Sequence, residues 1–259
     1  PAETPTSVPA ETLPPVIRET PEPSLEPEET PTVKPHETPE PSVSPDAEKD
    51  KETNSVKKIR KGSKVTDKKT KAVYKITGTG KNRTAEYVKS TEKNPVSVSV
   101  LSSVKLQGKT YKITSVGKGA FKNSKKLKIV KIGKNVKKIG KQAFSGCTKL
   151  TDVALGKNVS SIEADAFNKC TALTLITIPS KVARIGDRAF YQCKNLQCII
   201  VKTKKLTAKS VGNNAFGKGE AEPWVIADKT KLRLYSKIFV AKGMSKKALF
   251  IIDPIKLIG

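Results

Sequence analysis

Apolar residues recur every 23 positions through the middle of the chain. The dipeptide Ala-Phe ends at Phe121, Phe144, Phe167, Phe190 and Phe216, so that its steps are 23, 23, 23 and 26 residues. Other apolar columns keep the 23-residue step: Leu127, Leu150, Leu173 and Leu196; Val130, Val153, Ile176 and Ile199; Ile132, Leu155, Ile178 and Val201; and Val116, Ile139, Ile162 and Ile185. Self-similarity at a period of this length predicts a solenoid in which each repeat forms one coil.

Each repeat has the pattern of one short strand followed by a return segment. In residues 150–172, Leu150, Val153 and Leu155 have the spacing of inward-pointing strand positions, and residues 165–167 suit a single helical or 3-10 turn. Burial of about eight side chains gains about 16 kcal/mol, less than the cost of ordering the repeat at about 1–2 kcal/mol per residue. Only stacked repeats are therefore stable, which predicts a β-rich leucine-rich-repeat solenoid over residues 111–222.

The flank before the repeats breaks the period and has the pattern of a cap. Residues 73–77, 84–88 and 97–101 alternate between apolar and polar positions, which predicts three strands. Together with a lysine-rich junction at 57–71, they form a predicted N-terminal β-cap over residues 57–110.

The flank after the repeats, residues 223–259, is predicted to form a C-terminal cap that contains a helix. Thr230 is placed to cap the N-terminus of this helix, which runs to Lys242 and stops at Gly243. The predicted apolar face holds Leu234, Ile238 and Ala241. The helix and the apolar run 248–252 are expected to seal the last coil.

Residues 1–56 differ from the rest in composition. They hold 13 of the 17 prolines, interleaved with Glu, Thr and Ser, and have too few apolar residues to offset the entropy of ordering. We expect a disordered, extended stalk. The chain begins at Pro1 without a signal peptide or an apolar run long enough to span a membrane, so we expect either that an N-terminal segment has been removed or that an N-terminal anchor lies upstream.

Charge divides the chain into an acidic tail and a basic body. Residues 1–50 hold 12 acidic and 3 basic residues (net −9), whereas residues 51–259 hold 47 basic and 12 acidic residues (net +35). The basic residues are 44 Lys and 6 Arg, and Lys supplies point charge without the forked geometry of a guanidinium. A diffuse positive field attracts polyanions without reading their sequence. A solubility coat has the same composition, and both interpretations stay open.

The body lacks the residue types of most catalytic and metal sites. His36, in the tail, is the one histidine, which excludes histidine triads, Cys–His dyads and Cys/His zinc sites from the repeats. The acids of the regular repeats form no recurring pair; they are Asp152, Glu163, Asp165 and Asp187. Asp165 is expected to cap its turn. We expect no enzyme activity, no catalytic residue, no metal and no cofactor.

Three of the four cysteines form a column of their own. Cys147, Cys170 and Cys193 keep the 23-residue step, and Ser124 occupies the same column. Stacked coils bring such residues to about 4.8 Å, but their side chains point in parallel, which disfavours a disulfide or a metal site and predicts buried thiols. Cys198 lies between inward positions and should face outward, so it is the thiol that we expect to react.

The outward positions of the strands form the predicted ligand face, because they carry no packing role. The candidate residues are Lys128, Ile129, Lys131, Asp152, Ala154, Leu175, Thr177, Cys198 and Ile200. Ile129, Leu175, Cys198 and Ile200 are apolar where solvent is expected, and an exposed apolar patch usually marks a contact surface. Cover by a cap or a neighbouring chain is the alternative.

The repeats resemble those of a known family. The string Val136-x-x-Ile139-Gly140-x-x-Ala143-Phe144-x-x-Cys147-x-x-Leu150-x-x-Val153-x-Leu155 is similar to BspA-like leucine-rich-repeat proteins, and the resemblance covers residues 111–222. These are secreted or wall-attached bacterial surface proteins. The resemblance implies a right-handed solenoid with a concave strand sheet, a role in adhesion or ligand binding, and no catalytic residues.

The predicted function is that of a non-catalytic, extracellular surface protein of a bacterium. Its expected partner is a protein or polysaccharide of a host or bacterial surface, bound through the solenoid. The alternative is a lysine-driven binder of anionic polymers such as teichoic acid, sulfated glycan or extracellular nucleic acid. Salt separates the two, because a polyanion complex loses affinity steeply as salt rises.

Overall fold

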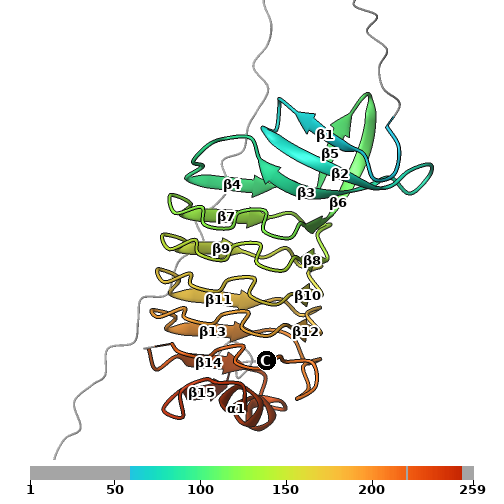
Figure 1. Ribbon diagram of the computed structural model, residues 1–259. Helices are drawn as coiled ribbons and strands as arrows, with labels where there is room; N and C mark the ends of the chain where they lie inside the picture. The colour runs from blue at the N-terminus through green and yellow to red at the C-terminus, as the bar shows by residue number, and fades with distance from the viewer. Residues whose placement is uncertain (1–58, 220, 253–259) are drawn as a thin grey trace, which may run out of the picture. The chain divides into compact units, whose positions relative to one another are not determined.

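The repeats stack as successive coils of a solenoid, with the strands of one wall lying side by side (Figure 1). The computed structural model describes residues 59–219 and 221–252. The predicted stalk, residues 1–56, lies outside the described residues, as do residues 253–259 of the predicted C-terminal cap. The solenoid predicted from the 23-residue period is confirmed.

One wall of the solenoid, called the strand wall below, holds one strand from each of seven described coils. These are β4 (Ser97–Val100), β7 (Ile129–Ile132), β9 (Asp152–Ala154), β11 (Leu175–Ile178), β13 (Cys198–Val201), β14 (Trp224–Ala227) and β15 (Leu249–Ile252). They pair in parallel within two sheets, β4-β7-β9 and β11-β13-β14-β15. Among the described residues, β9 and β11 lie side by side but form no ladder, so the hydrogen bonding along the wall has a break at its middle.

A second ladder runs along the return side and continues into the N-terminal cap. It consists of β6 (Lys109–Val116), β8 (Lys138–Ile139), β10 (Ser161–Ile162) and β12 (Arg184–Ile185), all parallel. The cap adds β1 (Lys64–Asp67), β2 (Ala72–Gly78), β3 (Thr84–Ser90) and β5 (Ser103–Leu106) to the same sheet. Because β3 and β5 pair with β6, the cap covers the N-terminal edge of this ladder.

The strand predicted at 97–101 belongs to the wall and not to the cap sheet. It forms β4, whose residues pair in register with β7 from Ser97 opposite Ile129 to Val100 opposite Ile132. The strands predicted at 73–77 and 84–88 do form the cap, as β2 and β3. Alternation identifies a strand in each case, but it carries no information on which sheet the strand joins.

The segments that contain the Ala-Phe dipeptides stack as turns. In one coil the backbone N–H groups of Asp165, Phe167 and Lys169 donate to carbonyls of the next coil, each at 2.8 Å. Asp165 and Lys169 have φ values of 56° and 62°, in the left-handed region. The segment predicted as a single turn is hydrogen-bonded as one, since the Asn168 N–H donates to the Asp165 carbonyl at 3.1 Å. It does not continue as a helix, because left-handed residues on both sides of Phe167 interrupt a right-handed helix.

The phenylalanines of the Ala-Phe dipeptides form a continuous stack inside the solenoid. Ring centroids of Phe121, Phe144, Phe167, Phe190 and Phe216 are 5.1–5.5 Å apart, and neighbouring planes are within 11° of parallel. The caps supply the end members, since Tyr87 stacks on Phe121 at 5.2 Å and Phe239 lies 4.6 Å from Phe216. The predicted core role of these rings is confirmed, because all five are buried.

The cysteine column is buried and links neighbouring coils. The thiols of Cys147, Cys170 and Cys193 donate to the carbonyl oxygens of Phe121, Phe144 and Phe167, at 3.0, 3.2 and 3.1 Å. Burial raises the pKa of Cys147 and Cys193 to about 12, and that of Cys170 also rises. The prediction of buried, unpaired thiols is confirmed.

The C-terminal helix, α1 (Leu232–Ala241), covers the last ring of the aromatic stack. Its buried face consists of Tyr235, Ile238 and Phe239. The predicted face is wrong at Leu234 and Ala241, which are exposed. Ile238 was placed correctly, but the aromatic side chains bury more apolar area than Leu234 and Ala241 and so determine which side faces inward.

The start of α1 also differs from the prediction, whereas its end agrees. Thr230 does not cap α1: its hydroxyl and its backbone N–H both donate to the Asp228 carboxylate, and the N-cap position is Lys231. Gly243, with φ 95°, ends the helix as predicted.

Removal of one ring should destabilise the whole array. Phe167→Ala is expected to lower the free energy of unfolding by about 3–5 kcal/mol, because it removes a buried side chain and both of its stacking contacts. Urea or thermal unfolding followed by circular dichroism measures the loss. The matched control is Lys157→Ala at an exposed position of the preceding loop, which should unfold like the unchanged protein. Equal stability of both variants contradicts the account.

Candidate functional site

The outward side chains of the strand wall form two aligned columns, fixed by the register of the ladders. The first holds Ser97, Ile129, Asp152, Leu175, Cys198, Trp224 and Leu249; the second holds Ser99, Lys131, Ala154, Thr177, Ile200, Ile226 and Ile251. The positions between them, such as Val130 and Ile176, are buried in the core. Side chains in the two columns therefore face away from the core and are available for contact.

The nine predicted ligand-face residues all lie on this surface, and none is buried. Lys128, which directly precedes β7, Lys131, Asp152, Ala154 and Leu175 are exposed, and the others are half-buried. The break between β9 and β11 divides the set between two sheets. Their role in ligand binding stays a prediction.

Six outward residues of the wall escaped the sequence analysis, namely Ser97 and Ser99 of β4 and four at the C-terminal end. Trp224, Ile226, Leu249 and Ile251 continue the two columns beyond Cys198, and Leu249 is 56% exposed. The analysis missed them because the 23-residue step becomes 26 from β13 to β14 and 25 from β14 to β15. A signal was present, since 224–227 and 249–252 are short apolar runs like 198–201.

The outward side chains of the C-terminal four strands, Thr177 excepted, thus form a contiguous apolar surface. We call it the apolar strip; it consists of Leu175, Cys198, Ile200, Trp224, Ile226, Leu249 and Ile251. Leu175, Trp224 and Ile251 are 39%, 38% and 40% exposed. Large apolar side chains gathered on adjacent strands are typical of contact surfaces, whereas singly scattered ones are not.

The N-terminal part of the array is strongly basic instead. Between Glu92 and Asp152 the sequence has fifteen lysines and no Asp or Glu. All fifteen lysines of this basic segment, residues 93–151, are exposed. One of them, Lys138, pairs with a carboxylate among the described residues, that of Glu163 at 3.7 Å. The positive field is therefore concentrated on the coils around β7 and β8.

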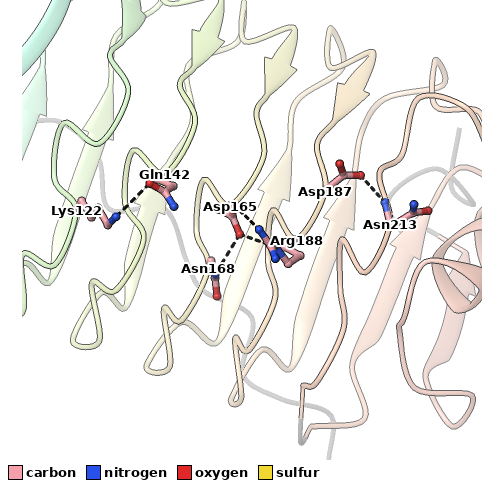
Figure 2. Close-up of polar contacts among 7 residues, drawn as sticks. All are labelled: Lys122, Gln142, Asp165, Asn168, Asp187, Arg188 and Asn213. Atoms are coloured by element: carbon pink, nitrogen blue, oxygen red, sulfur yellow. Dashed lines mark hydrogen bonds and ion pairs between the residues drawn. The ribbon is translucent and has the colours of Figure 1, made fainter.

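The turn side carries polar contacts between coils, which Figure 2 shows. Asp165, 2% exposed, accepts hydrogen bonds from Arg188 at 2.9 and 3.1 Å and from the Asn168 amide at 3.0 Å. The same carboxylate raises the pKa of Arg188. Asp165 accepts from side chains, so the prediction that it caps its own turn is wrong.

Other contacts on the turn side also join neighbouring coils. Lys122 donates to Gln142 at 3.2 Å, and the Asp187 carboxylate accepts the backbone N–H of Asn213 at 2.7 Å. In residues 59–219 and 221–252 no three His, Cys, Asp or Glu side chains gather as a metal site would require. The polar contacts of the turn side therefore hold neighbouring coils together.

Cys198 is the thiol that differs from the others. It is half-buried within the apolar strip, whereas Cys147, Cys170 and Cys193 are buried. Partial burial raises the pKa of Cys198 as well. Its outward position agrees with the prediction, and its greater reactivity follows from access.

Thiol labelling should distinguish these environments. With a disulfide reagent at pH 8, we expect one thiol per native chain to react quickly and the other three only on unfolding, because only Cys198 is accessible. Absorbance of the released thiolate measures the rates. Cys198→Ser is the control and should abolish the fast phase. Fast reaction of Cys170 in the native protein contradicts the inward assignment of its column.

Comparisons with known proteins agree with this architecture. Residues 97–221 match, in six copies, the family model described as BspA type leucine rich repeat region. The leucine-rich repeat protein of T. pallidum is 25% identical, with a TM-score of 0.51 over 62% of this chain and 71% of that chain. No curated protein sequence matches the chain.

Two further solved structures are similar over part of the chain. A leucine-rich repeat protein from Bacteroides capillosus is 27% identical, with a TM-score of 0.47 over 54% of this chain and 98% of that chain. The pneumococcal vaccine antigen PcpA is 18% identical, with a TM-score of 0.49 over 67% of this chain and 52% of that chain. No helix among the described residues has the length and apolar character needed to cross a membrane. The chain is a leucine-rich-repeat solenoid whose repeats, over residues 97–221, are of the BspA type.

Proposed function

We propose that this protein is a non-catalytic interaction module of a bacterial cell surface, which binds a protein or polysaccharide partner through the strand wall. The observation that carries the proposal is the apolar character of outward positions such as Leu175, Trp224 and Leu249. Inward residues of the same strands already complete the core, so packing within the coil does not require apolar side chains on the outside. An apolar surface without a packing role is a contact surface.

Location at the cell surface is supported by the family and by the composition of the chain. BspA-like proteins, which the repeats resemble, are secreted or attached to the cell wall. The proline-rich residues 1–56 have the composition of an extended spacer. We infer that the solenoid is displayed at the surface of the cell.

A binding role without catalysis is supported by the residues on the wall. Asp152 is the one carboxylate in the two outward columns, and the repeats contain no histidine. General acid–base chemistry needs a positioned pair of groups with suitable pKa values, and the wall offers no such pair. Leucine-rich-repeat solenoids are typically binding modules.

The basic segment supports a second candidate function, the binding of anionic polymers. Fifteen exposed lysines, of which Lys138 alone pairs with a described carboxylate, would release condensed counterions from teichoic acid, sulfated glycan or nucleic acid. Lysine lacks the bidentate geometry of arginine, so such binding would follow charge density and not sequence. The basic segment and the apolar strip lie on different coils, so the two candidates can be tested separately.

A glycan-and-protein array probed with the full chain at about 50 mM and about 200 mM salt separates the candidates. A partner on the apolar surface should keep nearly the same affinity at both concentrations. A polyanion should lose on the order of a hundredfold if four charges are neutralised. Retention that is independent of salt supports the first candidate, and a steep loss for every bound probe supports the second.

A bulky side chain on the wall tests the binding face directly. Thr177→Arg places a long cation at an outward position of β11 and should weaken binding of the array partner at least about tenfold. Thr110→Arg, at an exposed position of β6, adds the same charge away from the wall and should leave affinity unchanged. Equal affinity of both variants for the partner contradicts the proposed face.

A further inference from the structure

The strand wall is divided, and its two parts suit different ligands. Outward positions of β4, β7 and β9 include Ser97, Lys131 and Asp152, whereas those of β13, β14 and β15 are all apolar. In the column that begins with Ser97, the change coincides with the break between β9 and β11. We propose that the apolar strip is the docking site for a protein segment that presents aliphatic side chains flanked by acidic residues. This inference rests on the proposed function and assigns a partner class to one part of the wall.

The chemistry of the strip favours a protein over a carbohydrate. Apart from the Cys198 thiol, its outward side chains carry no hydrogen-bonding group except the indole N–H of Trp224. Recognition of a sugar requires polar groups that pair with its hydroxyls, because unpaired hydroxyls are costly to bury. Leucine and isoleucine side chains instead gain by removing other aliphatic side chains from water.

The size of the strip suits the centre of an interface. Strands about 4.8 Å apart place Leu175 and Leu249 about 14 Å from each other, and the two columns are about 7 Å apart. A strip of about 14 Å by 7 Å has a much smaller area than the roughly 800 Å² that each partner buries in a stable complex. The residues around the strip must therefore contribute as a polar rim, and their charge decides which partners fit.

The rim is positively charged. Lys202, Lys205 and Lys229 follow the ends of β13 and β14, are exposed, and take part in no ion pair among the described residues. The described carboxylates of the rim are already engaged, since Asp228 pairs with Lys204 at 2.8 Å and Glu222 with Lys247 at 3.2 Å. Acidic residues beside the aliphatic centre of a partner would complement this rim.

The same charge argues against a second copy of this chain as the occupant. Two strips facing each other would bring like-charged rims together, and residues 51–259 carry a net charge of +35 (47 basic and 12 acidic residues). Juxtaposed like charges disfavour association. An acidic partner avoids this repulsion, so the charge of the rim favours a segment of a different protein over a second copy of this chain.

A display selection tests the proposal with a defined probe. The full chain is used to select from a library of random twelve-residue peptides, and affinities of the recovered peptides are measured by fluorescence anisotropy. We expect peptides with two or more aliphatic or aromatic residues among Asp and Glu. Leu249→Thr/Ile251→Thr should weaken their binding at least about tenfold, because it removes two apolar contacts and keeps strand-forming side chains. Trp224→Thr, on an inner strand, is the second variant and should weaken it to a similar extent.

Matched controls separate the strip from the rest of the wall. Leu234→Thr makes the same kind of change at an exposed position of α1, outside the wall, and it should leave affinity unchanged. Ile129→Thr makes it in the same column but outside the strip, and it tests whether the rest of the wall contributes to binding. Lys202→Glu/Lys229→Glu should weaken binding of the acidic peptides. Lys157→Glu, in the loop that follows β9 and away from the rim, should have a smaller effect. Unchanged circular dichroism melts establish that each variant is folded.

Two results would overturn the inference, and they differ in what they say about the proposed binding face. If the recovered peptides are insensitive to the strip variants but lose affinity in Ile129→Thr, the wall is a binding face and the strip is not its docking site. If recovered peptides are basic or lack apolar residues, or if none is recovered, the assigned partner class is wrong. In that case the array experiment with Thr177→Arg still decides whether the wall binds at all.

Discussion

Stacking of one phenylalanine ring per coil is the interaction on which the rest of this structure depends. Rings 5.1–5.5 Å apart run from Phe121 to Phe216, and Tyr87 and Phe239 extend the column into both caps. A coil cannot rotate or slip relative to its neighbour without losing this contact. The thiol of Cys170 reinforces the register by donating to a carbonyl of the preceding coil. Alignment inside the solenoid thereby fixes the alignment of the side chains outside it.

That fixed register allows the outer surface to differ from coil to coil at little cost in stability. Inward columns are nearly invariant, whereas the outward column that begins with Ser97 passes through Asp152 and ends with Trp224 and Leu249. The N-terminal coils are basic, and the C-terminal coils are apolar on the strand wall. One scaffold therefore offers two chemically distinct surfaces, and the proposed partner uses the apolar one. A repeat protein can change either surface without repacking its core.

The sequence predicts those parts of the fold that follow from periodicity, and it fails where the period changes. The columns of Phe167 and Cys170 are buried as expected, because a recurring residue occupies equivalent places in successive coils. The outward residues Trp224 and Leu249 were missed, since the spacing between strands lengthens after Cys198. Local patterns misled in two further places. The face of α1 is set by its aromatic residues and not by Leu234, and the left-handed backbone at Asp165 cannot be inferred from its neighbours. Whether the outward residues bind a ligand is a property of the partner as well, so no pattern in one chain decides it.

Hydroxyl-radical footprinting of the full chain, with and without a protein bound in the array experiment, tests the central claim most directly. Mass spectrometry reports oxidation of each side chain, and therefore its access to solvent. The account predicts that binding protects Leu175, Trp224 and Leu249 while the turn-side residue Tyr191 and the aromatic stack keep their original rates. Protection confined to the turn side, with unchanged oxidation of Trp224 and Leu249, would contradict the assignment of the strand wall as the binding face.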